Sequence, residues 1–181
     1  LHLLSNRKDN QIVAINCASI TESLLESELF GHEKGAFTGA VRRKKGFFSI
    51  ANQGTLFLDE VSEMPLSMQA KLLRVLEDKQ FYSVGGEKHQ QVDIRIISAS
   101  SQDLSRMVAE GTFRKELFYR LHVIPINLPP LRERTTDIPL LTNHFLRKYA
   151  EKMNKSIEPL SPSIMENLMS YDWPGNVRQL E

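Results

Sequence analysis

Thr55-Leu56-Phe57-Leu58-Asp59-Glu60 decides the fold, because an uninterrupted apolar run leads directly into two adjacent acids. Such a run is typical of a strand buried on both faces in a parallel sheet. Ligands in open α/β sheets bind beyond the carboxyl ends of the strands, so the acids lie where a site is expected. Successive strand residues point to opposite faces, so Asp59 and Glu60 can perform two different tasks. Taken alone, an acidic pair after a strand also fits a solvated turn.

Strands and helices alternate on both sides of this run. Further strands are predicted at 12–17, 94–99 and 123–128, the last ended by two prolines. Helices are predicted at 21–30, 47–51, 65–77, 103–110 and 114–121, residues 1–7 look like the end of another, and 81–92 reads as a hairpin. Within 65–77, one side carries Leu66, Ala70, Leu73 and Leu76. The alternation predicts an α/β fold with a parallel sheet flanked by helices.

The pattern changes to helices alone from about residue 136. Helices are predicted at 137–153, after Ser161 with Pro162 at the first position, and at 177–181. We therefore expect two domains, an α/β domain at 1–134 and a small helical domain at 135–181. Trp173, between the last two helices, is expected to pack in a core rather than to carry function.

The composition is that of an ordinary globular protein, with 41% hydrophobic and 25% charged residues among 181. A net charge of +1 gives no reason to expect that the domain grips nucleic acid by bulk electrostatics. Cys17 is the only cysteine, so it forms no internal disulfide and no metal site by itself. The chain shows neither an apolar stretch long enough for a membrane span nor a signal peptide, so we expect a cytoplasmic protein without membrane contact.

Gly35-Ala36-Phe37-Thr38-Gly39-Ala40 places one aromatic ring and one hydroxyl among four residues with little or no side chain. Such a run cannot fill a core, and its two glycines favour a loop. A single large apolar side chain on a loop suits contact with a partner. The basic run 42–45 that follows is interpreted as a solvated face of this loop.

This loop, the preceding stretch Glu28-Leu29-Phe30-Gly31-His32-Glu33 and the acid-terminated strand together resemble one known family. It is the central ATPase domain of bacterial enhancer-binding activators of sigma-54 RNA polymerase, a branch of the AAA+ proteins. The resemblance covers essentially the whole chain. It implies an AAA+ sheet with a helical lid, ATP hydrolysis, and remodelling of sigma-54 RNA polymerase to open promoters. In this family the Gly35–Ala40 loop contacts the sigma factor, with Phe37 and Thr38 carrying the contact.

The resemblance also implies roles for residues near the acids. Asp59 would hold Mg²⁺, through water, and Glu60 would orient the water that attacks ATP. Asn16, at the end of the preceding strand, would bond Glu60 and couple the nucleotide state to the loop; a capping role is the alternative. Ser100 and Ser101 stand where the family usually has threonine and asparagine, the sensor I position. Hydroxyls can bond a phosphate or a water there, but they reach less far than an amide.

The resemblance assigns nucleotide-reading roles to arginines as well. Arg114 and Arg120 resemble arginine fingers that act on a neighbour's nucleotide, which a planar, permanently charged guanidinium suits; ordinary solvated arginines are the alternative. Arg178, in Trp173-Pro174-Gly175-Asn176-Val177-Arg178, resembles the sensor II of the lid. A finger that acts in trans requires a homo-oligomer, by resemblance a hexamer. Gly85-Gly86 resembles a second pore loop or is a plain hairpin turn.

The 181 residues contain no G-x-x-x-x-G-K-[ST] phosphate loop. In the resembling family that loop lies upstream, so we expect a fragment that lacks the first strand and this loop and binds ATP poorly alone. DNA binding is expected through a separate C-terminal domain outside this chain. Two other interpretations stay open, a non-catalytic interaction module and a generic AAA+ ATPase acting on another partner. The Gly35–Ala40 loop argues against the generic ATPase.

Overall fold

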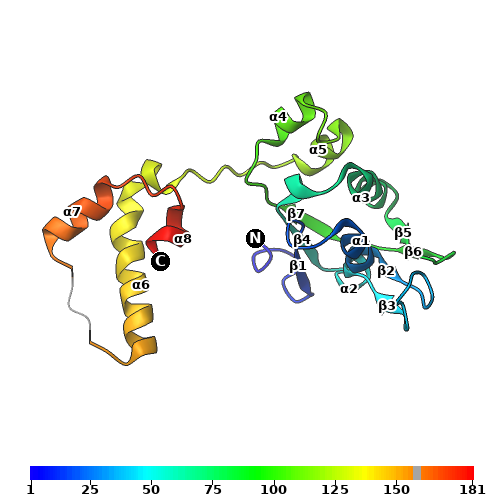
Figure 1. The fold of residues 1–181 in the computed structure, drawn as a ribbon, viewed down its shortest axis with the longest axis horizontal. Coiled ribbons are helices and arrows are strands. Elements are labelled where there is room, and N and C mark those ends of the chain that lie inside the picture. The colour runs from blue at the N-terminus through cyan, green and yellow to red at the C-terminus, as the bar shows by residue number, and fades with distance from the viewer. Residues whose placement is uncertain (157–159) are drawn as a thin grey trace. The chain divides into compact units, whose positions relative to one another are not determined.

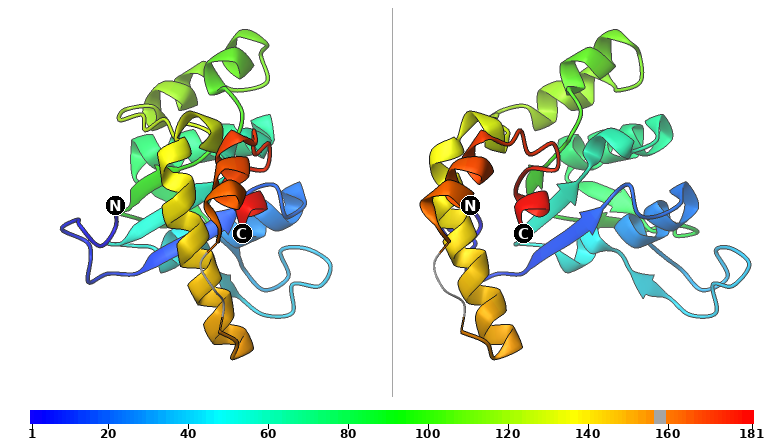
Figure 2. Two further views of the ribbon diagram at one scale, coloured as in Figure 1. Left: turned by 90° about the vertical axis from the view of Figure 1, so that its left-hand side faces the viewer. Right: turned by 60° about the vertical axis from the view of Figure 1, so that its left-hand side comes forward.

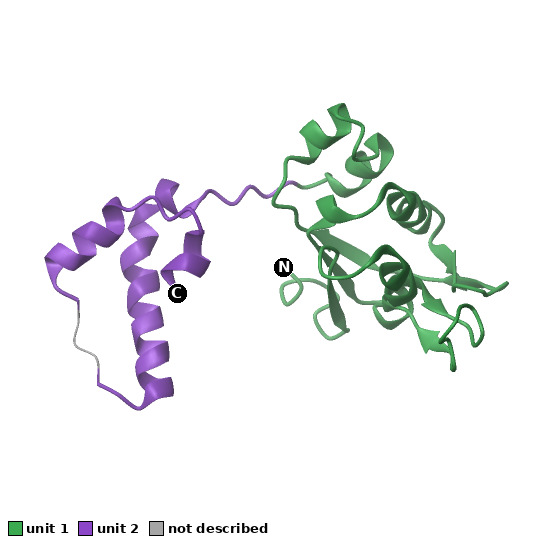
Figure 3. Cartoon of the chain, in the orientation of Figure 1, with its two compact units in different colours: residues 1–124 green, residues 125–181 purple. Residues whose placement is uncertain are grey.

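The computed structural model describes residues 1–156 and 160–181, which form two compact units, Leu1–Ile124 and Pro125–Glu181 (Figure 3). The division lies earlier in the chain than the boundary expected between residues 134 and 135. The reason is that Leu131 is already buried in the core of the second unit, together with Ile138 and Trp173.

The first unit is built on a parallel sheet in the order β1 (Ile12–Asn16), β4 (Thr55–Asp59) and β7 (Arg95–Ser98) (Figure 1). The predicted α/β fold with a parallel sheet is thus confirmed. Leu56 and Leu58 are fully buried, whereas Phe57 on the opposite face is only half-buried. One face of the central strand is therefore fully buried and the other is only partly buried, whereas the sequence predicted burial of both faces.

One continuous apolar core joins the sheet to its helices. The helices of the first unit are α1 (Glu22–Phe30), α2 (Phe47–Ile50), α3 (Leu66–Asp78), α4 (Leu104–Ala109) and α5 (Lys115–Leu121), with a 3-10 turn η1 (Val61–Glu63). Leu29 of α1, Leu72 of α3 and Leu117 of α5 are fully buried in that core together with Leu58. The core therefore fixes these helices to the strand that ends in the acids.

A protruding loop leaves the first unit between two short antiparallel strands, β2 (Gly31–His32) and β3 (Lys44–Lys45) (Figure 2). Its two legs meet so closely that a Cβ on Gly46 would lie 2.3 Å from the backbone nitrogen of Gly31. The predicted hairpin over 81–92 is confirmed as β5 (Gln80–Tyr82) and β6 (His89–Gln91). Its turn bonds the base of the loop, because Val84 N–H donates to Gly31 O at 2.9 Å.

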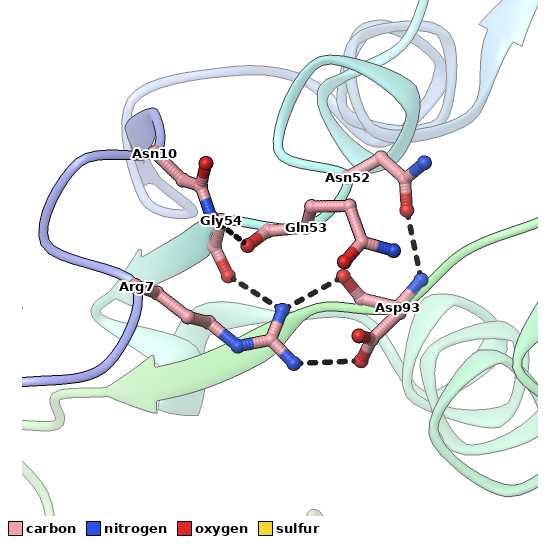
Figure 4. Close-up of polar contacts among 6 residues, drawn as sticks. All are labelled: Arg7, Asn10, Asn52, Gln53, Gly54 and Asp93. Atoms are coloured by element: carbon pink, nitrogen blue, oxygen red, sulfur yellow. Dashed lines mark hydrogen bonds and ion pairs between the residues drawn. The ribbon is translucent and has the colours of Figure 1, made fainter.

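The first ten residues form successive turns, not the helix end predicted for residues 1–7. Their backbone bonds join residues three apart, as from Ser5 N–H to His2 O at 2.9 Å. The Arg7 guanidinium donates to the carbonyls of Gly54 and Asp93 and pairs with the Asp93 carboxylate at 2.7 Å (Figure 4). These contacts tie the segment to the starts of β4 and β7, the end of the sheet opposite the two acids.

The fourth strand predicted at 123–128 is wrong, because within the described residues no strand pairs with this segment. Its apolar side chains are exposed, Ile124 by 81%. A strand needs a neighbour for its backbone groups, and Pro125 has no N–H to offer one. The apolar pattern therefore marked an extended segment without a pairing partner.

The second unit is helical, as predicted. It contains two 3-10 turns, η2 (Leu131–Glu133) and η3 (Thr135–Asp137), and the helices α6 (Ile138–Met153), α7 (Pro162–Ser170) and α8 (Asn176–Leu180). Trp173 is buried and donates from its indole Nε1 to Leu168 O at 2.7 Å, which confirms core packing. None of the helices in the described part of the chain combines the length and apolarity that a membrane crossing requires.

Candidate functional site

The carboxyl ends of the three parallel strands bring polar side chains together, and we call Asn16, Asp59, Glu60 and Ser101 the carboxyl-edge site. Asn16 and Asp59 are register partners at the ends of β1 and β4. Opposed residues of a parallel pair point to the same face, so their side chains meet. The Asn16 amide donates to the Asp59 carboxylate, with 3.0 Å between Nδ2 and Oδ2.

The contact expected between Asn16 and Glu60 is therefore not the one in the structure. Glu60 instead accepts two bonds from Ser101, from Oγ at 2.7 Å and from the backbone N–H at 3.1 Å. Ser101 follows β7, whose Ser98 pairs with Leu58, so the chain after β7 runs beside the chain after β4. Ser100 turns elsewhere, because its hydroxyl donates to Gln102 O at 2.8 Å.

The bonds from Ser101 change the acidity of Glu60. The hydroxyl of Ser101, and after it the backbone N–H of Ser101, lowers the pKa of the Glu60 carboxyl below its ordinary value. Hydrogen bonds to the charged form favour it, so Glu60 stays ionised at a lower pH than an ordinary glutamate. An ionised carboxylate can accept a proton or orient a water.

Ser101→Ala is expected to raise the pKa of Glu60 toward the ordinary glutamate value, because the hydroxyl bond is lost while the backbone bond remains. The stabilisation from this bond is present above the unfolded-state pKa and is lost as the pH falls through the lowered folded-state value. Carboxyl ¹³C chemical shifts followed against pH measure the midpoint. Ser100→Ala is the control and should leave the midpoint unchanged; equal midpoints in Ser101→Ala and the native chain would contradict the assignment.

The backbone of Glu60 is left-handed, with φ 52° and ψ 51°. This conformation costs a residue with a Cβ roughly 1–2 kcal/mol, and glycine avoids most of that cost. Such strain persists only where surrounding structure fixes it, and it occurs often at functional sites. The turn directs the Glu60 carboxylate toward Ser101 immediately after β4 ends.

The Glu60→Gly variant is expected to have a free energy of unfolding about 1 kcal/mol higher than the Glu60→Ala variant. Both lose the carboxylate, but only alanine is strained by a positive φ. Urea unfolding of the two variants measures the difference. The same pair at Glu63 serves as the control. Glu63 lies in η1 and is not among the positive-φ residues, so alanine should be the more stable there. An alanine variant at least as stable as the glycine variant at position 60 would rule out strain.

Asp59 has one neighbour that the sequence did not associate with it. Cys17 is buried beside the site and its backbone N–H donates to Asp59 O at 2.9 Å. Burial, and then the charge of Asp59, raises the pKa of the Cys17 thiol to about 11. The thiol therefore stays protonated at neutral pH, and Asp59 is the anionic group available to a cation at this position.

The predicted arginines are not gathered around the carboxyl-edge site by any described contact. Arg114 is the N-cap residue before α5 and has an exposed side chain, and its backbone N–H donates to Gln69 Oε1 at 2.8 Å. The Arg120 guanidinium donates to Leu76 O on α3 at 2.9 Å. Arg178 is exposed on α8 in the second unit. The Arg120 guanidinium is thus bonded to α3 of the same chain, whereas the described residues leave the Arg114 guanidinium without a hydrogen bond.

The loop at residues 33–43 presents Phe37 with 47% of its surface exposed. Its turns are closed by backbone bonds, from Gly35 N–H to Ala40 O at 2.8 Å and from Ala40 N–H to Phe37 O at 2.9 Å. Gly35 and Gly39 have φ of 83° and 101°, which residues with a Cβ rarely adopt. The loop is therefore a defined turn with an exposed ring, as its composition predicts.

Sequence reasoning missed the residues that support this ring from below. The rings of His32 and Phe37 lie edge to face with 5.0 Å between centroids. His32 is buried, and its Nδ1 shares a hydrogen bond of 2.8 Å with Ser27 Oγ on α1. A helix–strand boundary that carries a histidine directly before the glycine-rich loop is the only sequence signal for this support.

Comparison with known proteins places the chain in a family. The sigma-54 interaction domain family matches residues 1–127, and the AAA+ ATPase lid domain family matches residues 132–181. The chain is 54% identical over 181 residues to the DNA-binding transcriptional activator HyfR of Escherichia coli (strain K12), covering 100% of this chain and 27% of that protein. It is also 54% identical over 180 residues to the regulatory protein AtoC of the same organism, covering 99% and 39%.

Solved structures support the same fold. NtrX from Brucella abortus in complex with ATP superposes with a TM-score of 0.90 at 44% identity, covering 99% of this chain and 38% of that one. Hsp104, at 20% identity and a TM-score of 0.64, shares the fold alone. The chain spans 27% to 39% of the length of the relatives HyfR, AtoC and NtrX. Its α/β sheet and helical lid are those of the AAA+ fold, and this chain belongs to the sigma-54 interaction domain family.

Proposed function

We propose that this chain is the ATP-hydrolysing core of a transcriptional activator that remodels sigma-54 RNA polymerase and so opens promoters. One observation carries the proposal. A single stretch, from Asn16 through α1 and β2 to Phe37, runs from the carboxyl-edge site to the exposed ring within one unit. The family match to a sigma-54 interaction domain supports the choice of partner.

The hydrolytic step is an in-line attack of water on the γ-phosphorus of ATP. The water oxygen forms the new bond to phosphorus, the bond from phosphorus to the β–γ bridging oxygen breaks, and ADP leaves. Glu60 orients the water and accepts its proton; the bonds from Ser101 lower the pKa of this carboxyl and so keep it in the ionised form that can do both. Ser101 holds that carboxylate through its hydroxyl and backbone, and this gives the sensor I position a role that a short hydroxyl can perform.

The residues present fit Mg²⁺ bound together with the substrate. Asp59 is half-exposed, and Asn16 occupies only its Oδ2 with a neutral amide donor. The described residues contain no group of three or more potential ligands among His, Cys, Asp and Glu. Magnesium is usually held by one or two carboxylates with waters and substrate phosphates, so Asp59 would serve as one such carboxylate. When bound, Mg²⁺ supplies positive charge against the phosphate oxygens.

Further nucleotide contacts within this chain come from arginines. Arg114 acts in trans on the nucleotide of the neighbouring subunit, and its exposed, unbonded guanidinium within the described residues supports this. Arg120 is the weaker candidate, because Leu76 O already accepts from it. Arg178 reads the nucleotide from the lid as sensor II. A trans arginine requires a ring, and a hexamer is the form that the family resemblance favours.

Coupling to the partner passes through Asn16 and the loop. A change of phosphate contacts at Asp59 and Glu60 shifts Asn16, and α1 transmits the shift to the Gly35–Ala40 loop. Phe37 and Thr38 then engage the sigma factor. The activator works in the cytoplasm, where transcription takes place, and it binds DNA through a separate C-terminal domain.

The test uses the full-length protein with sigma-54 RNA polymerase on a promoter that this polymerase recognises. ATP, but not a non-hydrolysable analogue, should produce melted promoter DNA, which permanganate reactivity of unpaired thymines measures. Polymerase carrying a different sigma factor is the control and should show no response. Hydrolysis of ATP without melting on any sigma-54 promoter would leave an ATPase for another partner, and the absence of hydrolysis would leave an interaction module.

A further inference from the structure

A fully buried amide in α3 joins two segments that the proposed mechanism uses. Gln69 has no exposed surface. Its Nε2 donates to Met64 O at 2.8 Å and to Thr112 O at 3.3 Å, and its Oε1 accepts from Arg114 N–H at 2.8 Å. All three partners are backbone groups outside α3 (Leu66–Asp78).

The position is one where an apolar side chain would be expected. The neighbouring buried residues of α3, Met68 and Leu72, are apolar and pack in the main core. A buried amide is costly unless its donors and acceptor are all paired, and here each finds a partner. A buried polar side chain holds the backbone groups that it bonds at a fixed distance and orientation, which an apolar side chain of the same size cannot do.

The bond to Arg114 fixes the backbone position from which the arginine side chain extends. Arg114 stands at the start of α5, and Gln69 holds its backbone N–H, which the first turn of a helix leaves without an intrahelical partner. Within the described residues no other side chain bonds Arg114, so its reach is determined by the backbone and by the length of the side chain. The bond to Thr112 O fixes the residue two positions earlier in the same way.

We propose that Gln69 is a positioning residue for the arginine that acts in trans, because it anchors the backbone at Arg114 to α3. This inference rests on the proposed trans role of Arg114. The bond to Met64 O offers a different route, since Met64 follows Glu60 through η1 and could act on the carboxylate of the same subunit. The two routes differ in the subunit whose active site is impaired.

The experiment mixes full-length variants in equal amounts. Gln69→Met keeps the volume and removes all three bonds; its own acids are intact and its arginine is misplaced. Glu60→Gln lacks the carboxylate and has a well-placed arginine. Each alone should turn over ATP with kcat reduced on the order of a hundredfold, because small displacements of a catalytic group cost about that much. In Gln69→Met, KM should stay unchanged.

The mixture should recover activity. By random pairing in a ring, about a quarter of the interfaces join an intact acid pair to a well-placed arginine. ATPase activity of the mixture should therefore approach about a quarter of the native value, far above the sum of the separate variants. No recovery would place the defect in the subunit's own site or its fold and overturn the proposal, as would native kcat in Gln69→Met alone.

Arg114→Ala mixed with Glu60→Gln separates this inference from its premise. Recovery with Arg114→Ala but not with Gln69→Met overturns the role of Gln69 and leaves the trans arginine standing. No recovery with Arg114→Ala overturns both. Should Gln69→Met fail to assemble, as judged by light scattering, Gln69→Leu replaces it in the same mixtures, because it also removes all three bonds, including the one from Arg114 N–H. The expected and contrary results are the same for it.

Discussion

Phe37→Ala in the full-length protein is expected to abolish promoter opening by sigma-54 RNA polymerase while ATP hydrolysis stays at the native rate. The ring is 47% exposed and lies outside the apolar core, so its removal should change the fold little. A buried aromatic contact at an interface is worth about 2–4 kcal/mol, which corresponds to a loss of binding of roughly 30- to 1,000-fold. Hydrolysis is spared because the carboxyl-edge site uses none of this surface.

Leu66→Ala provides a matched control, because Leu66 is 46% exposed at the start of α3 and away from the loop. It should leave both promoter opening and hydrolysis unchanged. Permanganate footprints and phosphate release, recorded on the same preparations, separate the two activities. Promoter opening that persists in Phe37→Ala would remove the assigned role from the loop. A parallel fall in hydrolysis would show that the ring serves the active site instead.

The sequence predicted the place of the acids better than their partners. The apolar run before Asp59 indicated a parallel strand, and the carboxyl end of such a strand is where the structure has both acids. The partner of Asn16 could not be predicted, because it depends on which residue of β4 stands opposite in the register. Neither strand alone contains that information, and the pairing of Asn16 with Asp59 follows only when both are aligned.

Helix phase explains why Gln69 was missed. The prediction for residues 65–77 followed the leucines and placed Leu66 on the buried side. In the structure Leu66 is half-exposed, and the buried residues are Met68, Gln69, Leu72, Val75 and Leu76, of which the predicted side contained only Leu76. The buried face of the helix is rotated by part of a turn from the predicted one, and this rotation brings an amide into a position where an apolar residue was expected. Whether a buried glutamine is tolerated depends on backbone groups far away in the chain, such as Arg114 N–H.

The strand predicted at residues 123–128 was wrong because the segment has an apolar pattern but no neighbouring strand to pair with. Periodicity reports which side chains avoid water, whereas a strand is defined by the backbone groups it pairs with. The exposed Phe37 shows the opposite case, since a glycine-rich run with a single large apolar side chain favours a loop wherever it lies. Composition therefore predicted the loop itself, while His32 and Ser27 beneath it required the folded chain.

Glu60→Gln is expected to reduce kcat for ATP hydrolysis by about 10²–10⁴, the range that a positioned general base contributes. The amide keeps the size of the carboxylate, and its Oε1 can still accept from Ser101, so the turn after β4 should persist. Nucleotide affinity should change little, because the carboxylate acts on the water rather than on the phosphates. Phosphate release and calorimetric titration with ATP on the full-length protein measure the two quantities.

Glu63→Gln tests whether the loss at Glu60 is more than the loss of a nearby negative charge. Glu63 is exposed three residues further along and accepts from Gln102 Nε2 at 2.6 Å, so the substitution removes the same charge from the same turn. It should leave kcat within about twofold of native, since an exposed charge beyond the site is screened by water and salt. Equal losses of kcat in the two variants would mean that Glu60 contributes only its negative charge. Full activity of Glu60→Gln would mean that the carboxylate has no part in the mechanism. A loss of kcat at Glu60 alone assigns proton acceptance to this carboxylate. Ser101 keeps it ionised, and the strained backbone of Glu60 directs it toward Ser101.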